Sequence, residues 1–431
     1  MNSVVGETRD RLGLSENLAP SLDFGLAQGR PRGPHDTVMR VAIICDLLEE
    51  QWPSMDLVAE MLFVNLKRNS SEEIAATVLR PKFDARFAVL PGIGQLGLAR
   101  KTDRMLNRFW YYPKVIAHSS GNFDLFHIID HSYAHLAHWL PSSSIVVTCH
   151  DVDPFRCLFK PAAENRSAIF RKMSRHILSG LRKAARVVCV SEATKADLLE
   201  HRLVAAERLI VIHNGVDPIF SAEPNAQAES ELVALLGPKP GDAGPELLHV
   251  GSTIERKRVD VLILVFAALL EKFPAARLIQ VGGALTDSQA ELARRLGVGE
   301  GIKVLPPIER SILSAMYRRA ALVLLPSDRE GFGLPVVESL ACGTPVVASD
   351  LPAFKEVGGK AVVYCPPGNV QQWVRQVAAL LLERHNQHEH WVARQLSGRQ
   401  RAAVFSWSEN ARKTAEVYAS LRQASPPRRA I

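Results

Sequence analysis

The chain has 431 residues, a hydrophobic fraction of 47% and a formal net charge of +7. This length exceeds one typical domain, so we expect two domains of roughly 200 residues, each large enough for a buried core. The longest wholly apolar run, Val261 to Leu270, is too short for a membrane span of ~20 residues, and no charged-then-apolar segment opens the chain, so we expect a cytoplasmic protein. The positive charge favours anionic partners such as nucleotide diphosphates or an acidic membrane surface. No motif supports a nucleic-acid partner.

The six cysteines are scattered through mostly apolar segments and form no C-x-x-C pair. This distribution is typical of reduced core thiols and argues against disulfides or a zinc site built from cysteine.

The first half of the chain begins with a segment rich in Gly, Pro, Arg and Asp, which we interpret as a flexible extension over 1–37. Val41 to Cys45 is the first predicted strand, and a loop leads from it to a helix near Asp56. Trp52 in this loop has two interpretations, a platform for an acceptor sugar ring or an ordinary packed tryptophan.

Residues 96–115 mix basic and aromatic side chains at helical spacing. One interpretation is an interfacial helix that rests on anionic lipid, which would give the protein a peripheral contact with the membrane. The other is a solvated basic face above a stripe of core residues.

Two further motifs lie on either side of the predicted strand Ile145 to Cys149. His131 and His135 are four residues apart and would share a helical face, which suggests a metal pair, but no third ligand stands at a typical spacing. The strand Ile145 to Cys149 delivers His150 to the carboxyl edge of its sheet. Asp151 to Asp153 imitates the D-x-D motif that holds a divalent cation against a diphosphate, an interpretation that we discount.

In the second half, a strand at Leu247 to Val250 is followed by Gly251 and a basic run through Arg258 before an apolar helix from Val259. The helix dipole by itself disfavours cations at the positive, N-terminal end of a helix. The basic run at this place therefore predicts that an anion binds to the loop.

Ala321 to Leu325 is predicted to be a central buried strand, followed by a glycine-containing loop and a helix that begins near Leu334 and ends at Gly343. Ligands bind beyond the carboxyl end of such a strand. Glu330 in the loop and Glu338 in the helix are therefore candidates for binding hydroxyl groups. The alternative is that both glutamates are solvated charges stabilised by the dipole at the start of the helix.

The full string E-G-F-G-L-P-V-V-E-S-L-A-C-G-T-P-V-V over 330–347 resembles the E-x7-E signature of glycosyltransferase family 4. T-C-H-D over 148–151 and N-G-V-D over 214–217 are similar to further segments of that family. The resemblance implies an α/β fold with two Rossmann-like domains facing each other (GT-B), a nucleotide-sugar donor and transfer with retention of anomeric configuration.

The resemblance also implies roles for individual residues. The family's first glutamate contacts the donor sugar and its second the ribose, so these roles fall to Glu330 and Glu338, while Lys257 would hold the diphosphate and His150 would approach the sugar. Ser252 stands where the family often has arginine, and Arg256 is the candidate to replace it. Together, the predicted catalytic residues are His150 and Glu330, and the predicted donor-binding residues are Gly251, Arg256, Lys257, Phe332, Gly333, Leu334 and Glu338.

We accordingly predict a first domain over 38–217, a linker over 218–245, a second domain over 246–404 that binds the nucleotide sugar, and a C-terminal helix over 405–424 that crosses back to the first domain. The predicted function is retaining hexosyl transfer from a GDP-mannose or UDP-glucose type donor to a saccharide or lipid-linked acceptor. No metal and no other cofactor are expected. The alternatives are a nucleotide-sugar 2-epimerase and a non-catalytic sugar-nucleotide sensor.

Overall fold

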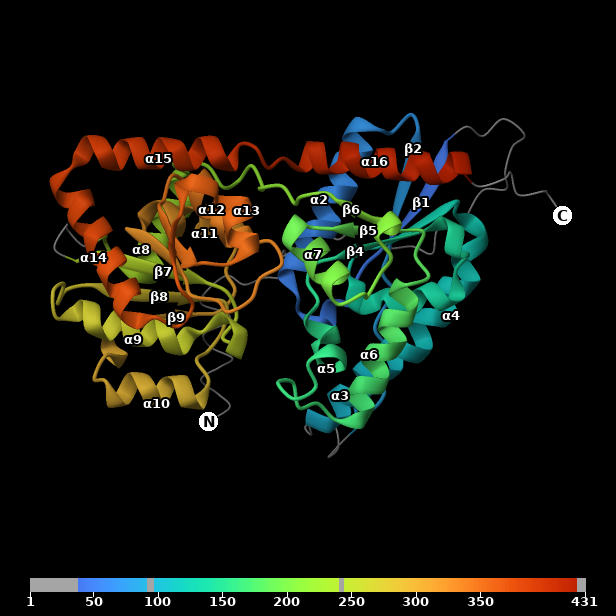
Figure 1. Cartoon of the computed structure of the whole chain (residues 1–431), viewed down its shortest axis with the longest axis horizontal. Helices are drawn as coiled ribbons and strands as arrows, with labels where there is room; N and C mark the ends of the chain where they lie inside the picture. Colours follow the sequence, from blue (N-terminus) through green and yellow to red (C-terminus); the bar gives the residue numbers. More distant parts are fainter. Residues whose placement is uncertain (1–37, 91–96, 240–243, 425–431) are drawn as a thin grey trace.

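The computed structural model describes residues 38–90, 97–239 and 244–424, which form two lobes side by side (Figure 1). The predicted flexible extension at 1–37 and the tail after Ala424 lie outside the described residues. Each lobe has a six-stranded sheet in which every strand pair is parallel. This is the predicted α/β architecture of two Rossmann-like lobes.

The sheet of the N-terminal lobe has the order β2-β1-β3-β4-β5-β6. Its strands are β1 (Met39–Ile44), β2 (Ile74–Leu79), β3 (Leu125–Ile128), β4 (Ile145–Cys149), β5 (Arg186–Cys189) and β6 (Leu209–Val211). Its helices are α2 (Pro53–Asn69), α3 (Gly97–Leu106), α4 (Tyr112–Ser119), α5 (Arg156–Phe159), α6 (Ala168–Leu181) and α7 (Glu192–Glu200). A π-helical turn, Asn107–Tyr111, joins α3 to α4, and a 3-10 helix covers His131–Trp139.

The sheet of the C-terminal lobe has the order β12-β11-β10-β7-β8-β9. Its strands are β7 (Glu246–Val250), β8 (Arg277–Val281), β9 (Ile302–Leu305), β10 (Leu322–Leu325), β11 (Val346–Ser349) and β12 (Val363–Cys365). The remaining helices are α8 (Ala226–Leu236), α9 (Val259–Leu270), α10 (Asp287–Arg295), α11 (Arg310–Arg319), α12 (Leu334–Ala341), α13 (Pro352–Gly358), α14 (Val370–Asn386), α15 (His388–Ala402) and α16 (Trp407–Ala424).

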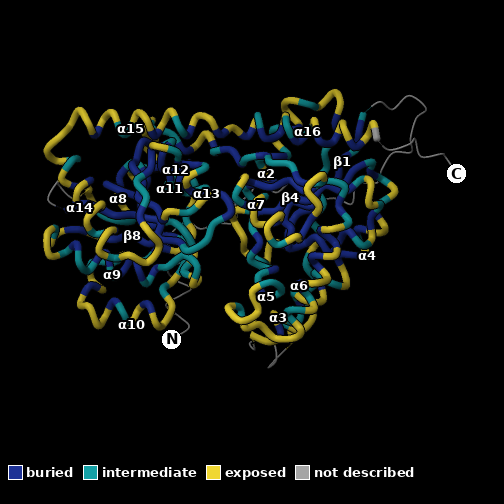
Figure 2. The backbone as a smooth tube through the Cα atoms, in the orientation of Figure 1, coloured by how far each residue is buried: buried dark blue, intermediate teal, exposed yellow. Residues whose placement is uncertain are grey.

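Both sheets are buried on both faces, as Figure 2 shows by the dark strands inside each lobe. In β1, Ala42 and Ile44 join one core cluster while Val41 and Ile43 join the cluster on the opposite face. Alternation of side chains between faces explains this division, and burial of both faces explains why β1 is continuously apolar from Val41 to Ile44 rather than alternating.

The C-terminal helices link the lobes. Helix α15 lies on the C-terminal lobe, and α16 continues along the N-terminal lobe beside α2 (Figure 1). Trp407 and Tyr418 of α16 pack into the same core cluster as Val41 and Ile43, so α16 is part of the N-terminal lobe although it ends the described chain.

Two further findings concern the cysteines and the helices. No disulfide joins the six cysteines, all of which are buried and lie within the described residues. None of the helices in the described part of the chain combines the length and apolarity that crossing a bilayer requires.

Candidate active site

The loops that carry the predicted donor residues meet at one edge of the C-terminal sheet. In its strand order, β7 and β10 are neighbours whose following helices lie on opposite sides, which makes this the switch point where ligands bind in open parallel sheets. The loop after β7 contains Arg256 and Lys257, and the loop after β10 contains Glu330. The amide of Asp328 donates a hydrogen bond to the carbonyl of Arg256 at 2.8 Å, which ties the two loops together.

Glu330 is the centre of a group of charges at this edge. One carboxylate oxygen accepts hydrogen bonds from Lys257 Nζ at 2.6 Å and Ser327 Oγ at 2.7 Å, and the other lies 3.3 Å from a terminal nitrogen of Arg256. Burial alone would raise the pKa of Glu330, but the charges of Lys257 and Arg256 outweigh burial and lower it. Glu330 is therefore ionised and pairs directly with both candidate diphosphate ligands.

Arg256 also reaches across to the N-terminal lobe. Its Nε lies 3.2 Å from a carboxylate oxygen of Asp153, and a terminal nitrogen lies 3.8 Å from Asp151. Arg329 pairs with Asp153 as well, at 3.2 Å. The two aspartates of the D-x-D string thus bind guanidinium groups of the opposite lobe.

His131 lies between Asp151 and Asp130 of its own lobe. Its Nδ1 lies 3.1 Å from Asp130 and its Nε2 lies 3.6 Å from Asp151. Burial lowers the pKa of His131, but the hydrogen bonds and charges of the two aspartates outweigh burial and raise it to about 10. The two carboxylates therefore favour the protonated ring of His131.

His150 lies at the end of β4, where the lobes touch. Its Nε2 donates a hydrogen bond to the carbonyl of Ile129 at 2.8 Å, and burial lowers the pKa of its ring. The neutral tautomer is thereby fixed, with the lone pair on Nδ1. A Cβ added to Gly331 would lie 1.6 Å from the carbonyl oxygen of His150, so the backbone of the donor loop is in direct contact with this histidine.

The remaining donor-loop residues have distinct environments. Gly333 adopts φ +104° at the start of α12, where an added Cβ would meet the ring of Phe354 at 2.9 Å, and Leu334 is the first residue of that helix. The ring of Phe332 packs against Phe405 in the lobe core, with ring centroids 5.7 Å apart, so its backbone is the part that remains for a ligand.

Gly251 follows β7 with φ +153°. A Cβ added there would meet Lys257 Cε at an ordinary contact distance of 3.6 Å, so it is the backbone angle rather than the space that favours glycine.

Glu338 lies in α12 and contacts a different set of residues from Glu330. Tyr317 donates its hydroxyl hydrogen to Glu338 at 2.8 Å, and burial raises the pKa of the carboxyl group to about 7. Near it, Arg310 bridges Asp217 at 2.7 Å and Glu60 of α2 at 2.9 Å, which again joins the two lobes. Within the described residues, no hydrogen bond or ion pair links Glu338 with Glu330.

The zinc interpretation of His131 and His135 gains no support. His135 donates from Nε2 to the carbonyl of Arg108 at 2.9 Å. Over 38–90, 97–239 and 244–424, no three metal-ligating side chains come together in a suitable group.

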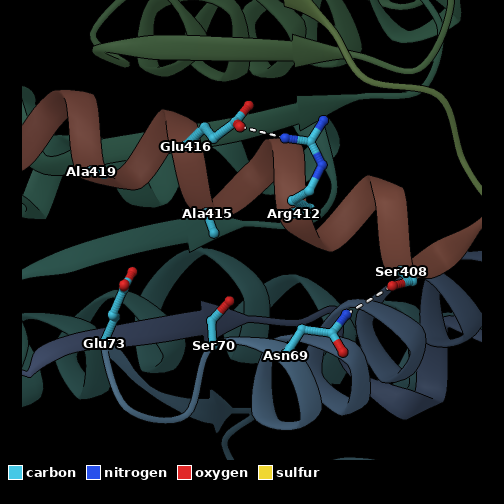
Figure 3. A pocket seen from close by; sticks show the side chains of 8 residues that line it. All are labelled: Asn69, Ser70, Glu73, Ser408, Arg412, Ala415, Glu416 and Ala419. Carbon is cyan, nitrogen blue, oxygen red and sulfur yellow. Dashed lines mark hydrogen bonds and ion pairs between the residues drawn. The ribbon is translucent and has the colours of Figure 1, made fainter.

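A surface hollow of about 410 Å³ also lies far from these residues, between the end of α2 and α16. Figure 3 shows the lining side chains, among which Asn69 donates to Ser408 at 2.9 Å and Arg412 pairs with Glu416. None of the predicted site residues lines it.

Asp153, His131 and Tyr317 had no predicted role in these contacts. Asp153 stands in the D-x-D string, whose metal interpretation the sequence analysis discounted, and His131 stands in a histidine pair that lacked a third ligand, so their motifs were visible but their partners were not. Tyr317 lies in a helix that the sequence analysis did not predict, and nothing in its neighbourhood along the chain indicates a partner for Glu338.

Family models match both lobes of the chain. The model described as Glycosyltransferase Family 4 matches residues 69–220, and the model described as Glycosyl transferases group 1 matches residues 239–395. The chain belongs to glycosyltransferase family 4. The second match contains the loops with Lys257 and Glu330.

Relatives with known names are similar over about half of their length. A D-inositol 3-phosphate glycosyltransferase from Thermobispora bispora is 32% identical over 248 residues, which cover 54% of this chain and 56% of the relative. One from Nocardiopsis dassonvillei is 32% identical over 273 residues, which cover 58% of each chain. The alignments thus span little more than half of these family 4 relatives.

Solved structures share the fold. A sucrose-phosphate synthase from Thermosynechococcus elongatus has a TM-score of 0.67 at 19% identity, covering 90% of this chain and all of that one. The Anabaena protein HepE in complex with UDP and glucose has a TM-score of 0.65 at 17% identity, covering 89% of this chain and all of that one. The predicted GT-B fold of this family 4 chain is confirmed.

Proposed function

We propose that the protein is a retaining glycosyltransferase that moves a hexose from a nucleotide sugar of the GDP-mannose or UDP-glucose type to a saccharide or lipid-linked acceptor. The observation that carries this proposal is the contact of Lys257 and Arg256 with Glu330 at the switch point of the C-terminal sheet. Two cations and a carboxylate at this place suit a diphosphate attached to a sugar. The names of the relatives and the UDP complex of a protein with the same fold support the same class of reaction.

In the proposed mechanism, Arg256 and Lys257 stabilise the negative charge that grows on the departing diphosphate. Glu330 faces the donor sugar, Glu338 binds the ribose, and His150 approaches the sugar from the N-terminal lobe. The acceptor attacks from the face that the diphosphate leaves, and the diphosphate helps to remove the acceptor's proton. These cations take the place of a metal, so we propose a reaction that needs neither a metal nor another cofactor.

A two-stage experiment tests the proposal. Thermal-shift measurements with UDP, GDP and ADP sugars identify the donor, and NMR of the product anomer then reports retention or inversion. We expect one donor to stabilise the protein, retained configuration in the product, and unchanged activity in EDTA. An inverted product or loss of activity in EDTA would contradict the mechanism.

The same measurements separate the rival functions. A nucleotide-sugar 2-epimerase converts its donor to the epimer without an acceptor, whereas a sensor binds the donor and leaves it intact. Transfer to an acceptor with release of the nucleotide diphosphate is the outcome that we expect, and it excludes both rivals.

We further propose that the basic and aromatic segment predicted over 96–115 contacts an anionic membrane surface from the cytoplasmic side. Leu98 is 72% exposed and Trp110 is 66% exposed, and exposed basic residues, including Arg100, Lys101 and Lys114, surround them. Basic and aromatic side chains together suit the headgroup region of a bilayer. Co-sedimentation with liposomes that contain anionic lipid at low salt tests this, and absence of binding would remove the proposal.

A further inference from the structure

Two buried polar side chains face each other inside the C-terminal sheet. His249 of β7 and Gln280 of β8 are paired in register, and their residues are 0% and 1% exposed. Each is the last residue but one of its strand. The pair therefore lies at the carboxyl edge of the sheet, next to the loop that carries Arg256 and Lys257.

The hydrogen bonds of this pair lead from the histidine to the backbone of that loop. Nε2 of Gln280 donates to the carbonyl oxygen of Gly251 at 2.7 Å and to that of Val281 at 3.3 Å. Carbonyl oxygens only accept hydrogen bonds, so Gln280 turns its amide nitrogen toward them and its amide oxygen toward His249. Nδ1 of His249 is bonded to that oxygen and must therefore carry the hydrogen. His249 thus fixes the orientation of Gln280, and Gln280 fixes the carbonyl of Gly251.

This arrangement leaves one atom of His249 without a partner. Burial lowers the pKa of the ring to about 4, so the ring is neutral at pH 7 and Nε2 bears a lone pair. Nε2 is buried and has no hydrogen-bond partner within the described residues. A buried polar pair with an unsatisfied acceptor stabilises a sheet less than two well-packed apolar side chains. The pair is therefore better explained by the backbone that it holds than by the stability of the sheet.

The geometry of the peptide bond shows what the pair controls. In a trans peptide the C=O and N–H groups point in opposite directions. Because the carbonyl of Gly251 points to Gln280, the N–H of Ser252 points away from Gln280. Ser252 is exposed, and its amide has no acceptor among the residues that the structure describes. The pair therefore directs a free backbone donor at the start of the loop.

The Gly251–Ser252 peptide lies beside the side chain of Lys257. A Cβ built on Gly251 would lie 3.5 Å from Cε1 of His249 and 3.6 Å from Cε of Lys257. A Cβ added to Gly282 would lie only 2.5 Å from the carbonyl oxygen of Gly251, so Gly282 allows the peptide to pack closely against the end of β8. The free amide is thus held next to a candidate diphosphate ligand.

We propose that His249 and Gln280 are positioning residues, which hold the Gly251–Ser252 peptide so that the amide of Ser252 binds a diphosphate oxygen of the donor beside Lys257. The inference rests on the proposed function, because the nucleotide sugar supplies the diphosphate. Backbone N–H groups of such loops bind phosphate oxygens in many nucleotide-binding proteins. Both side chains are buried, so they act on the donor through the backbone alone.

NMR of the Ser252 amide tests the contact. Addition of UDP or GDP to the wild-type protein should move the amide proton of Ser252 downfield, as a hydrogen bond to a phosphate oxygen does. Gln280→Met keeps the length of the side chain and removes its donor. In this variant the Ser252 shift should be reduced, and nucleotide affinity measured by calorimetry should fall roughly tenfold or more, the effect of losing a hydrogen bond to a charged group.

Two further variants separate positioning from stability. His249→Leu combined with Gln280→Met removes both polar side chains, so this double variant should be more stable than Gln280→Met alone and equally weak in nucleotide binding. His249→Asn leaves a cavity, but its amide N–H can replace Nδ1–H as the donor to Gln280. It should therefore melt earlier than wild type and still bind nucleotide within about threefold of the wild-type affinity. Affinity that follows stability through all three variants would overturn the proposal.

The matched control is Glu246→Gln, at the opposite end of β7. Glu246 is buried and paired with Arg319 at 2.6 and 2.8 Å, so the control should lower the melting temperature and leave the Ser252 resonance and nucleotide affinity unchanged. Nucleotide binding without a response of Ser252, or an affinity of Gln280→Met within about twofold of wild type, would overturn the inference alone. Failure of UDP, GDP and every nucleotide sugar to bind the wild-type protein would refute the proposed function and this inference with it.

Discussion

Ser191 donates a hydrogen bond from its hydroxyl group to the carbonyl oxygen of Gly331 at 2.5 Å, across 140 positions of the chain. Ser191 also accepts from the amide of Thr194 and so caps α7 of the N-terminal lobe, while Gly331 belongs to the donor loop of the C-terminal lobe. A helix start in one lobe therefore fixes the loop that carries Glu330 in the other.

Because an added methyl group at Gly331 would lie 1.6 Å from the carbonyl oxygen of His150, Gly331→Ala should force the lobes apart. We expect transfer activity to fall roughly 100-fold through misplaced reacting groups. Small-angle scattering should show a larger radius of gyration, while circular dichroism stays unchanged. Gly299→Ala is the control, since a methyl group there meets no atom within 4 Å. Full activity in Gly331→Ala would show that this contact is dispensable.

Lys257→Met removes the cation that lies 2.6 Å from Glu330. If Lys257 stabilises the departing diphosphate, kcat/KM for the donor should fall roughly 100- to 1,000-fold, the usual effect of removing a group that stabilises transition-state charge. Steady-state kinetics with the donor identified by thermal shift measure this. Lys303→Met, a change at an exposed lysine of β9 in the same lobe, should leave the kinetics unchanged. Equal kinetics in both variants would refute the role of Lys257.

If Arg256 holds the diphosphate, Asp153 competes with that diphosphate, because Asp153 lies 3.2 Å from both Arg256 and Arg329. Asp153→Asn should therefore increase donor affinity roughly two- to fivefold, the range expected for a partly exposed ion pair. Calorimetric titration at low salt is the appropriate measurement. Asp84→Asn, which breaks an exposed ion pair with Arg86 in the same lobe, should not change donor affinity. A weaker donor affinity in Asp153→Asn would mean that Asp153 contributes to donor binding instead.

Burial raises the pKa of Glu338 from 4.5 to about 7. Between these values the unfolded chain has released the proton while the folded chain retains it, so stability decreases as pH rises from about 4.5 to 7 and then levels off. The decrease should be on the order of 3 kcal/mol. Urea denaturation at pH 5 and pH 7.5 should show that Glu338→Gln reduces this decrease. The same pH dependence in wild type and variant would contradict the assignment.

The ring of His131 should keep its second proton well above neutral pH. Its folded pKa of about 10 exceeds the ordinary 6.5, so the stability that it contributes is complete below pH 6.5 and is lost as pH rises through 10. NMR of the ring carbon-bound protons should therefore show no titration between pH 6 and 8. His127, whose burial lowers its pKa to about 3, is the internal comparison and should stay neutral over the same range. A midpoint near 6.5 for His131 would refute its pairing with both aspartates.

Several elements could be predicted from local pattern. The predicted strand at 145–149 has the same bounds as β4. The predicted strand, glycine loop and helix over 321–343 correspond to β10 and α12, and β10 begins one residue later than predicted. Strand β2 and helices α11 and α15 were not predicted. Helix α15 is polar over most of its length, and its place depends on packing by Trp391 and on the close approach of Gly398 to Leu340. Helix α8, within the predicted linker, packs on α11 of the C-terminal lobe.

By itself, the sequence determined that Lys257 and Glu330 lie close together. Lys257 and Glu330 stand in short motifs whose strand, loop and helix signals are local, so their meeting at one sheet edge follows from the parallel topology. Only the tertiary structure decided that Asp151 and Asp153 bind Arg256, that two aspartates raise the pKa of His131, and that Asp46 is buried without a partner among the described residues. Those relationships depend on how two separately folded sheets face each other and on which side chains exclude water, and no spacing along a single chain encodes them.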